Sequence, residues 1–184
     1  MRIISGTLKG KKLSPFQGDT IRPTSDRIRE AVFNILAPRI QGSVVLDLFA
    51  GTGALGIEAL SRGASAATFV EKDTAAVALL RRNLNLCGFE TLSTVIQWNI
   101  LKSLQCLQPQ DSRFDLVFMD PPYRKDLIPN TLRHLHISRV LQKNALVVVE
   151  HSQFDSIQEI PTEFKPKDER RYRKTLVSFL EYMV

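Results

Sequence analysis

Residues 44–56 read VVLDLFAGTGALG, an apolar run that leads directly into a glycine-rich loop. A run with so few polar residues is typical of a strand that is buried on both faces. Gly51, Gly53 and Gly56 satisfy the spacing GxGxxG, and Glu71 follows Gly51 by twenty positions. Glycines after a strand allow a tight turn and a close approach of the backbone to a ligand, while the later acid accepts hydrogen bonds from ribose hydroxyls. The stretch therefore predicts an adenosine-type cofactor, bound by either a methyltransferase or a nicotinamide dehydrogenase; a glycine turn without a ligand is the structural alternative.

Short apolar runs alternate with helical windows along the rest of the chain. The runs lie at 44–49, 67–71, 93–97, 114–120, 145–150 and 175–182, and the windows lie at 54–62, 73–87, 100–106 and 126–141. Parallel strands that are covered by helices on both faces give this pattern. We therefore expect a doubly wound α/β fold with a mostly parallel sheet and with ligands at the carboxyl ends of its strands.

The composition is that of an ordinary globular chain, with 184 residues, 43% hydrophobic, 24% charged and two cysteines. No apolar run approaches the roughly 18 residues of a membrane span, and the first residues contain no secretory leader. Cys87 and Cys106 form no CxxC motif, so reduced thiols are expected. These features argue against secreted, membrane and disulfide-rich proteins and predict a cytoplasmic one.

The net charge of +6 is concentrated at the start of the chain. Residues 1–40 carry +5, residues 41–160 carry −1 and residues 161–184 carry +2. A near-neutral body with a basic N-terminal segment fits a polyanionic partner that docks at one end. A basic face that is simply solvated is equally compatible with the charge alone.

The chain is expected to divide near residue 40. Residues 1–40 would form a basic N-terminal arm and a helix packed on the core, and residues 41–184 would form the α/β domain. Residues 2–13 predict short strands punctuated by Gly6 and Gly10, which together would make a hairpin-like arm.

The helix of this N-terminal part is expected to begin near Thr24 or Ser25 and to end at Pro38. Its apolar positions follow the spacing of a half-buried helix, with Arg27 and Arg29 off the apolar stripe. The stripe consists of Ile28, Ala31, Val32, Ile35 and Leu36.

Asp47 lies inside the first apolar run, where an isolated carboxylate is costly to bury unless it is hydrogen-bonded. It would accept hydrogen bonds from backbone N–H groups of the glycine loop or from the ammonium group of a cofactor. Pinning of the loop without any contact to a ligand is the structural alternative.

The run at 114–120 ends in the rare tetrapeptide Asp120-Pro121-Pro122-Tyr123. It resembles the (Asp/Asn)-Pro-Pro-(Tyr/Phe) site of S-adenosylmethionine (SAM)-dependent enzymes that methylate exocyclic amines of bases. Such an amine is a poor nucleophile, because its lone pair is delocalised into the ring. The Asp120 carboxylate and the Pro121 carbonyl would each accept one N–H, which localises the lone pair, and neither proline donates a competing N–H. Tyr123 would stack on the target base, an interaction worth about 1–3 kcal/mol per base.

The resemblance extends over nearly the whole chain, to the RsmD-type family, whose members methylate N2 of one guanine in 16S ribosomal RNA. It is carried by residues 2–6, 22–36, 46–63, 120–123 and 147–151, of which 22–36 are the most specific. The resemblance implies a seven-stranded class I methyltransferase fold, with residues 41–184 as the methyltransferase domain. It also implies SAM as methyl donor without a metal, and 16S rRNA within the assembling small ribosomal subunit as substrate. No membrane and no obligate protein partner is expected.

The family pattern implies a role for each candidate site residue. Gly51 and Gly53 would face the methionine end of SAM, while Glu71 would bind its ribose. Asn99 would lie at the adenine, where many class I methyltransferases have an aspartate. The expected cofactor-binding residues are Asp47, Phe49, Gly51, Gly53, Glu71, Lys72, Asn99 and Ile100. The expected catalytic residues are Asp120, Pro121 and Tyr123, and the expected substrate-binding residues are Pro122, Arg22, Thr24, Arg27, Lys9, Lys11 and Lys12.

The basic substrate-binding residues are expected to contact RNA phosphates, which position the protein without reading sequence. As an alternative, Arg22 and Arg27 would brace the glycine loop. The family pattern has one further departure near the end of the chain, where Arg173 stands at a turn position that is usually glycine.

The predicted function is methyl transfer from SAM to the N2 amine of a guanine in 16S rRNA. The tetrapeptide would also suit a DNA adenine-N6 or cytosine-N4 methyltransferase, although 184 residues leave little room for a target-recognition domain. A nicotinamide-dependent oxidoreductase would use the GxGxxG loop but leaves Asp120 and its neighbours unexplained. A non-catalytic RNA-binding factor with a relic cofactor fold is the third alternative.

Overall fold

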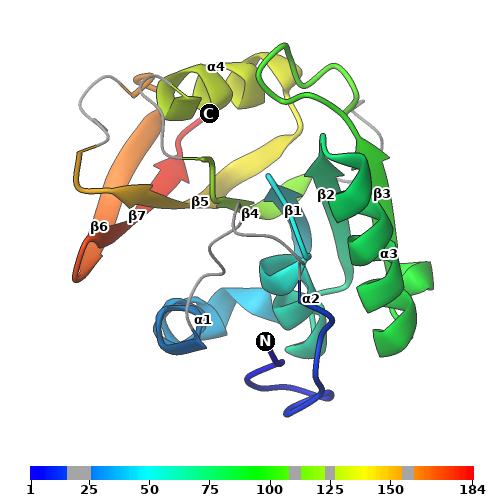
Figure 1. The fold of residues 1–184 in the computed structure, drawn as a ribbon. Coiled ribbons are helices and arrows are strands. Elements are labelled where there is room, and N and C mark those ends of the chain that lie inside the picture. The colour runs from blue at the N-terminus through cyan, green and yellow to red at the C-terminus, as the bar shows by residue number, and fades with distance from the viewer. Residues whose placement is uncertain (16–25, 108–112, 123–126, 155–159) are drawn as a thin grey trace.

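A seven-stranded sheet with the order β3-β2-β1-β4-β5-β7-β6 forms the centre of the computed structural model (Figure 1), which describes residues 1–15, 26–107, 113–122, 127–154 and 160–184. The strands are β1 (Val44–Leu48), β2 (Ala66–Glu71), β3 (Ser93–Gln97), β4 (Phe114–Met119), β5 (Leu141–Ser152), β6 (Phe164–Tyr172) and β7 (Thr175–Tyr182). The first five strands pair in parallel, whereas β7 runs antiparallel to both β5 and β6. The predicted doubly wound, mostly parallel sheet of seven strands is confirmed.

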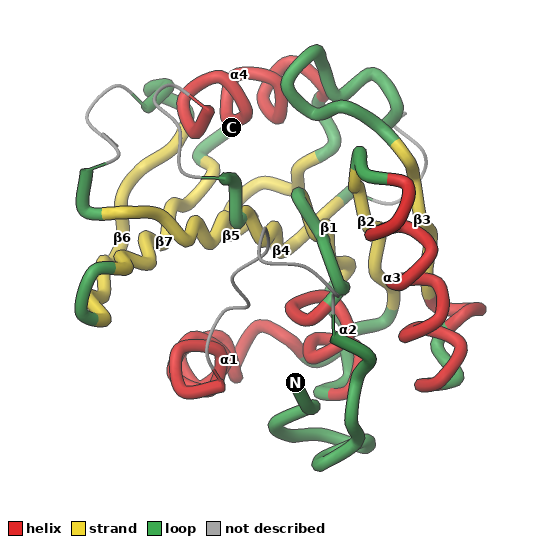
Figure 2. The backbone as a smooth tube through the Cα atoms, in the orientation of Figure 1, coloured by secondary structure: helices red, strands yellow, loops and turns green. Residues whose placement is uncertain are grey.

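Helices cover both faces of the sheet (Figure 2). They are α1 (Asp26–Ile40), α2 (Ala54–Ser61), α3 (Thr74–Cys87) and α4 (Leu127–Ser138), with a 3-10 turn at Glu90–Leu92. Buried residues of α1, α2 and α3 share one apolar cluster with one face of the sheet. Buried residues of α4 and of segment 100–107 form a second cluster on the other face. Both faces are thus occupied, so a ligand has to bind at an edge of the sheet.

The carboxyl ends of the central strands meet at one such edge. Leu48, the last residue of β1, pairs with Val70 of β2 on one side and with Met119 of β4 on the other. The chain moves outward from β1 to β3 and then returns to the opposite side of β1 as β4. The loops after β1 and β4 therefore flank the topological switch point, the place where open α/β sheets bind their ligands.

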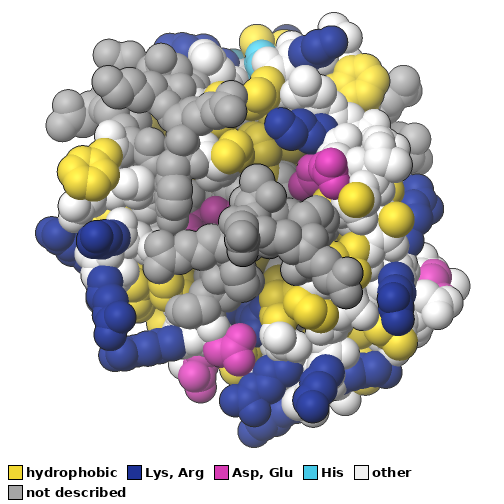
Figure 3. Space-filling view, in the orientation of Figure 1, with side chains coloured by type: hydrophobic (Ala, Val, Ile, Leu, Met, Phe, Trp, Pro, Cys, Tyr) yellow, Lys and Arg dark blue, Asp and Glu magenta, His cyan; other side chains and the backbone are white. Residues whose placement is uncertain are grey.

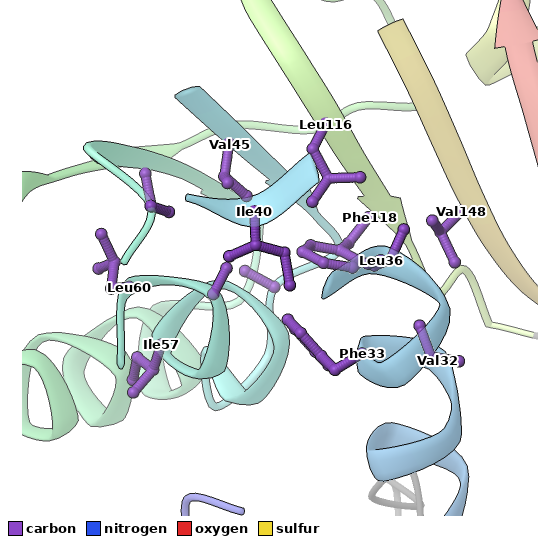
Figure 4. Packing of buried hydrophobic residues seen from close by; sticks show 14 of the residues in the cluster. Val32, Phe33, Leu36, Ile40, Val45, Ile57, Leu60, Leu116, Phe118 and Val148 are labelled. Atoms are coloured by element: carbon purple, nitrogen blue, oxygen red, sulfur yellow. The ribbon is translucent and has the colours of Figure 1, made fainter. Parts of the chain in front are cut away.

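Helix α1 packs against the central strands through an apolar face (Figure 4). Phe33 lies against Phe118 of β4, with the ring centroids 5.3 Å apart. Arg62 at the end of α2 places its guanidinium 4.9 Å from the centroid of the Phe33 ring, within the range of a cation–π contact. The N-terminal helix is therefore part of the same apolar core as the sheet.

Three expectations for α1 are wrong. Arg29, expected off the apolar stripe, is fully buried, and its Nη2 donates to the Arg2 carbonyl and to Asp26 Oδ1. Its long stem buries well while these acceptors satisfy part of the charged head. Ile35, expected on the buried face, is 39% exposed. The helix also continues past Pro38, because a proline in the last turn removes only one intrahelical hydrogen bond.

Residues 100–106 form turns instead of the expected helix. Asn99 Oδ1 accepts the N–H of Leu101 at 3.1 Å, and Trp98 Nε1 donates to the carbonyl of Ser103 at 2.9 Å. These side chains occupy backbone groups that a helix would pair internally. The helix-like apolar spacing of this segment reflects its burial in the second core cluster.

Strand β6 has no counterpart among the predicted runs. Its sequence FKPKDERRY is mostly charged and contains Pro166, and it lies at the edge of the sheet. An edge strand tolerates both features, because one row of its backbone groups has no neighbouring strand. In the two-residue loop between Tyr172 and Thr175, Arg173 adopts a left-handed φ of 58°. The β6–β7 turn therefore forms with an arginine at the position where the resemblance implies a glycine.

Candidate functional site

The glycine loop after β1 is held by its own hydrogen bonds. The N–H of Gly51 donates to Glu71 Oε2 at 3.0 Å, and that of Gly53 donates to a carbonyl of the loop at 2.7 Å. The N–H of Gly56, in the first turn of α2, donates to Asp47 Oδ2 at 2.9 Å. All three glycine N–H groups are therefore engaged within the protein, and Asp47 accepts one of them, as expected for either of its predicted roles.

The three glycines are required for different reasons. A Cβ at Gly53 would lie 2.3 Å from Leu80 Cδ1, and a Cβ at Gly56 would lie 2.3 Å from the ring of Phe69. A Cβ at Gly51 would have only a loop carbonyl near it, at 3.9 Å. Gly53 thus allows the loop to pack closely on α3, and Gly56 allows α2 to pack closely on β2. Beside Gly51 the space is open.

Asp47 is the most deeply buried acid at this edge, with 2% of its surface exposed. Burial raises the pKa of Asp47 to about 8; the hydrogen bond from Gly56 opposes this rise, and the nearby Glu71 carboxylate adds to it. A carboxyl group with such a pKa is largely protonated at neutral pH, and a cation placed beside it would favour the ionised form. The position is therefore suited to respond to a bound ammonium group.

Glu71 ends β2 with a half-buried carboxylate that accepts three backbone N–H groups. Oε1 accepts those of Lys72 at 2.7 Å and Asp73 at 2.9 Å, and Oε2 accepts that of Gly51 at 3.0 Å. A carboxylate offers about four acceptor positions, so about one is left for a ligand hydroxyl. The side chain of Lys72 is exposed next to it.

Asn99 follows β3 at the same edge and is half-buried. Its Oδ1 is engaged by the N–H of Leu101, while its amide NH2 has no hydrogen-bond partner in the described part of the chain. Ile100 is 3% exposed and belongs to the second core cluster, so its side chain packs in the core next to this edge of the sheet. Trp98 is 37% exposed and does not fill the core.

The Asp-Pro-Pro motif leaves β4 directly beside the glycine loop, because the last residues of β1 and β4 pair. Asp120 is half-buried, Pro121 is buried and Pro122 is exposed. Phe49, which follows β1 at this level, has a left-handed φ of 59°, a conformation that costs energy for any residue with a Cβ. Tyr123 lies outside the described residues. The structure thus brings Asp120 and the cofactor-type loop to the same edge.

The N-terminal segment, residues 1–15, folds back on itself against α2 and α3. Its predicted hairpin-like form is present as a single antiparallel bridge between Arg2 and Lys12, without regular strands. The side chains of Ile3 and Leu13 are buried in the first core cluster. The segment is therefore anchored to the α/β domain by apolar packing.

Glu58 of α2 holds the N-terminal segment by its backbone, a role that the sequence analysis missed. This fully buried carboxylate accepts the N–H of Ile4 at 2.7 Å and that of Ser5 at 3.0 Å. It also pairs with Arg62 Nε at 2.7 Å. A lone acidic residue in the otherwise apolar helix ALGIEALS is the signal that could have revealed it.

Asn83 of α3, which the sequence analysis also missed, links the N-terminal segment to the glycine loop. Its fully buried amide accepts the N–H of Ser14 at 2.8 Å and donates to the carbonyl of Thr52 at 3.0 Å. One side chain thereby fixes the position of the basic segment relative to the cofactor-type loop. The sequence around Asn83 gives no sign of these two hydrogen bonds, because an asparagine within a helix is as compatible with an exposed position as with a buried one.

The basic residues predicted to bind substrate are displayed on the surface. Figure 3 shows Lys and Arg side chains along the lower edge of the view, where Figure 1 places the N-terminal segment. The described members of this set, all exposed, are Lys9, Lys11, Lys12 and Arg27. No hydrogen bond or ion pair joins Arg27 to the glycine loop among the described residues, so bracing is not observed for it. Arg22 and Thr24 lie outside the described residues.

Metal ligands do not cluster in the described part of the chain. No group of three or more His, Cys, Asp or Glu side chains there could hold a metal ion. Cys87 and Cys106 are free thiols. Among the described helices, none combines the length and the apolar character needed to cross a membrane.

The whole chain is similar to known methyltransferases in sequence and in structure. The family model described as "Conserved hypothetical protein 95" matches residues 1–181. "Ribosomal RNA small subunit methyltransferase D" of Haemophilus influenzae is 42% identical over 154 residues, which cover 82% of this chain and 78% of that protein. The solved structure "Putative methyltransferase yhhF from Escherichia coli" has a TM-score of 0.87 at 35% identity and covers 100% of this chain and 98% of that chain. SMU.776, solved in complex with SAH, has a TM-score of 0.65 at 16% identity over 83% of this chain and 49% of that one, a likeness of fold alone.

Proposed function

The chain belongs to the RsmD-type family, whose model is described as Conserved hypothetical protein 95, and on that premise we propose that it methylates the N2 amine of a guanine in 16S ribosomal RNA with SAM as donor. The observation that carries the proposal is the meeting of the glycine loop and the Asp-Pro-Pro motif on neighbouring strands. The substrate would be the RNA within the assembling small ribosomal subunit, in the cytoplasm.

The residues after β1 and β2 fit SAM. Gly51 has open space on the side where a ligand would approach, and Glu71 retains about one acceptor position for a ribose hydroxyl. Burial raises the pKa of Asp47 to about 8, and the ammonium group of SAM would favour its ionised form. SAM would supply a methyl group on a positively charged sulfur. SAH is SAM without this methyl group, and its presence in a protein of the same fold supports the choice of donor.

Asp120 and Pro121 would prepare the guanine amine. The Asp120 carboxylate would accept one N–H and the Pro121 carbonyl the other, which directs the nitrogen lone pair out of conjugation with the ring. Pro121 and Pro122 have no N–H of their own that could compete for these acceptors. The amine gains a positive charge as it is methylated, and Asp120 would take up the proton that it then loses. Alignment of the reacting atoms supplies much of the rate in such displacements.

The basic N-terminal segment supports an RNA substrate. Lys9, Lys11 and Lys12 are exposed on a segment whose backbone is fixed to α2 and α3 by Glu58 and Asn83. Cations held at fixed positions on this segment would contact phosphates and set the orientation of the RNA. This arrangement would position a polyanion without selecting its sequence.

The experiment has two parts, because cofactor and substrate can fail separately. SAM, and not NAD, should raise the thermal unfolding midpoint of the protein, since a ligand stabilises only the folded state that binds it. With labelled SAM, label should enter small ribosomal subunits that lack their modifications, in competition with double-stranded DNA and naked rRNA. Protection by NAD alone would favour the oxidoreductase, label in DNA alone would favour the DNA methyltransferase, and SAM binding without any transfer would favour the RNA-binding factor.

A further inference from the structure

The tip of the β6–β7 hairpin carries a concentration of positive charge besides that of the N-terminal segment. Arg170 pairs with Asp168 at 2.8 Å, but the three other basic residues of the tip form no salt bridge within the described part of the chain. Arg171 donates from Nη2 to Gln153 Oε1 at 2.8 Å and from Nε to the Arg173 carbonyl at 3.3 Å, and both of these partners are uncharged. The three residues, all exposed, are Arg171, Arg173 and Lys174. Figure 3 shows Lys and Arg side chains gathered at the lower left, where Figure 1 places this tip.

Strand register places this tip on the substrate side of the protein. Met119 pairs with Val149 of β5, so Asp120 is level with the next residue, Glu150, which pairs with Val177 of β7. The tip extends two or three residues beyond that level, about 7–10 Å at the usual rise of a strand, and it stands three strand spacings, about 14 Å, to the side. A strand of RNA whose guanine reaches Asp120 would pass within reach of it.

An exposed aromatic ring lies next to these charges. Phe154 is 81% exposed and comes two residues after the end of β5, and its N–H donates to Ser152 Oγ at 3.2 Å. Ser152 pairs with Thr175, the first residue after the tip, and the Arg171–Gln153 hydrogen bond ties the two segments together. Aromatic side chains beside a basic surface are the usual platform for single-stranded nucleic acid, in which bases stack and phosphates meet cations.

We propose that Phe154 together with Arg171, Arg173 and Lys174 forms a second RNA-binding surface, which receives unpaired nucleotides next to the target guanine. The inference rests on the proposed function and adds the form of the substrate, a single strand rather than a duplex. Phe154 stacks on a flanking base, and the three cations bind phosphates of the same strand.

A charged edge strand has a simpler role, which is to prevent pairing with the edge of another sheet. That role suits Lys165 and Lys167, which lie along β6 itself. It also suits Arg171, which lies within β6, but it does not account for Arg173 and Lys174, which lie beyond the last strand pair, Tyr172–Thr175. Nor does it account for the left-handed φ of 58° that Arg173 holds where a glycine would be free of strain.

The first test removes charge from the tip without disturbing the turn. In the double variant Arg173→Gly/Lys174→Ala, glycine adopts the left-handed conformation freely, so the hairpin should remain folded. Loss of two phosphate contacts to single-stranded RNA should lower the magnitude of the slope of log affinity against log salt by about 1.4. We expect KM for unmodified small subunits to rise while kcat and SAM affinity stay unchanged. The matched control Lys143→Ala/Lys165→Ala removes equal charge far from the tip and should leave the slope as it is.

The second test separates stacking from charge. Phe154→Ala should weaken binding to the same subunits by about tenfold, at the scale of one lost base stack, without changing the salt slope. Phe154→Tyr keeps the ring and should bind as the unaltered protein does.

Two results would overturn the inference while the proposed function stands: a salt slope in the tip variant equal to that of the unaltered protein and the control, or full affinity in Phe154→Ala. If the unaltered protein neither binds nor methylates small subunits, the proposed function fails and the inference fails with it. A tip variant that loses SAM binding as well would also contradict the inference, because the tip would then act on the fold as a whole.

Discussion

The two halves of the site edge are built in different ways. The proposed cofactor half, after β1 and β2, is a set of hydrogen bonds in which Asp47 and Glu71 accept N–H groups of the glycine loop and of the first turn of α2. The proposed substrate half consists of the loop at Asp120 and of basic segments, and the N-terminal one of these is held in place by distant parts of the chain. Glu58 and Asn83, for example, fix the N-terminal segment from helices more than fifty residues away.

This difference has a functional meaning. One half must present the same small molecule at every turnover, and a loop without free glycine N–H groups is a rigid frame for it. The other half must accept a large polyanion, and exposed cations on anchored segments provide affinity without a closed pocket. Substitutions in the two halves should therefore separate donor binding from methyl transfer and RNA binding.

The largest difference between the effect on methyl transfer and the effect on SAM binding is expected at Asp120. Replacement by alanine removes one acceptor for the amine and the group that takes its proton, so methyl transfer should fall at least a hundredfold, about 2.7 kcal/mol of transition-state stabilisation. SAM affinity should be retained, because the donor is bound by the other half. Single-turnover transfer and SAM titration measure the two effects. Asp120→Asn keeps one acceptor oxygen, so its rate of methyl transfer should lie between the rates of the unaltered protein and of the alanine variant. Normal turnover by the alanine variant would remove Asp120 from the mechanism.

Two glycines of the cofactor half should respond differently to the same substitution. Gly53→Ala combines a left-handed φ of 79° with a Cβ 2.3 Å from Leu80, so we expect a loss of about 3 kcal/mol in the free energy of unfolding. Gly51→Ala adds a Cβ in open space, so it should cost about 1 kcal/mol for its conformation but strongly weaken SAM binding. Urea unfolding and SAM titration of both variants compare them. Equal stability loss in the two would show that the space beside Gly51 is not open.

Detachment of the N-terminal segment should have a smaller effect. Glu58→Ala leaves the N–H groups of Ile4 and Ser5 without their acceptor, at a cost of about 2 kcal/mol. RNA affinity should fall with it, whereas SAM affinity should change little. The exposed Glu30 serves as a matched control, and Glu30→Ala should stay within about 0.5 kcal/mol of the unaltered protein. Unchanged stability in Glu58→Ala would contradict the anchoring role.

Asp47 should make the stability of the cofactor half depend on pH. A carboxyl group with a higher pKa in the folded chain takes up a proton on folding, so its contribution to stability is lost as pH rises. For Asp47 the loss should extend from its ordinary pKa of 3.8 to about 8. Asp47→Asn keeps an oxygen for the Gly56 N–H and should flatten the unfolding free energy across this range. An identical pH profile in both proteins would show that Asp47 is ionised in the fold.

The same group should make SAM binding release a proton. If the ammonium of SAM lies beside Asp47, the carboxyl ionises as the ligand binds at neutral pH. Calorimetric titrations in buffers of different ionisation enthalpy measure the protons released, and Asp47→Asn should release fewer.

The smallest individual effects are expected from the lysines of the N-terminal segment. Replacing Lys9, Lys11 and Lys12 together by alanine should weaken binding to small subunits and flatten its salt dependence, because each exposed lysine contributes one phosphate contact at most. Unaltered binding at low and high salt would assign these residues to a solvated face.

The two halves also differ in how far the sequence reveals them. The loop after β1, Glu71 and the Asp-Pro-Pro motif are local patterns, and the fold places them at one edge as predicted. Glu58, Asn83 and buried Arg29 act through partners far along the chain, which no periodicity records. β6 was missed because an edge strand needs no apolar pattern, and residues 100–106 were misjudged because buried turns can share the apolar spacing of a helix.

The most direct test of the account is the identity of the nucleoside formed when the protein acts on small ribosomal subunits that lack their modifications. Digestion of the labelled RNA and chromatography of its nucleosides should show a single product, N2-methylguanosine, absent in the Asp120→Ala variant. A methylated adenosine or cytidine, or a methylated ribose, would contradict the account, because the group placed at Asp120 would then not be the guanine amine.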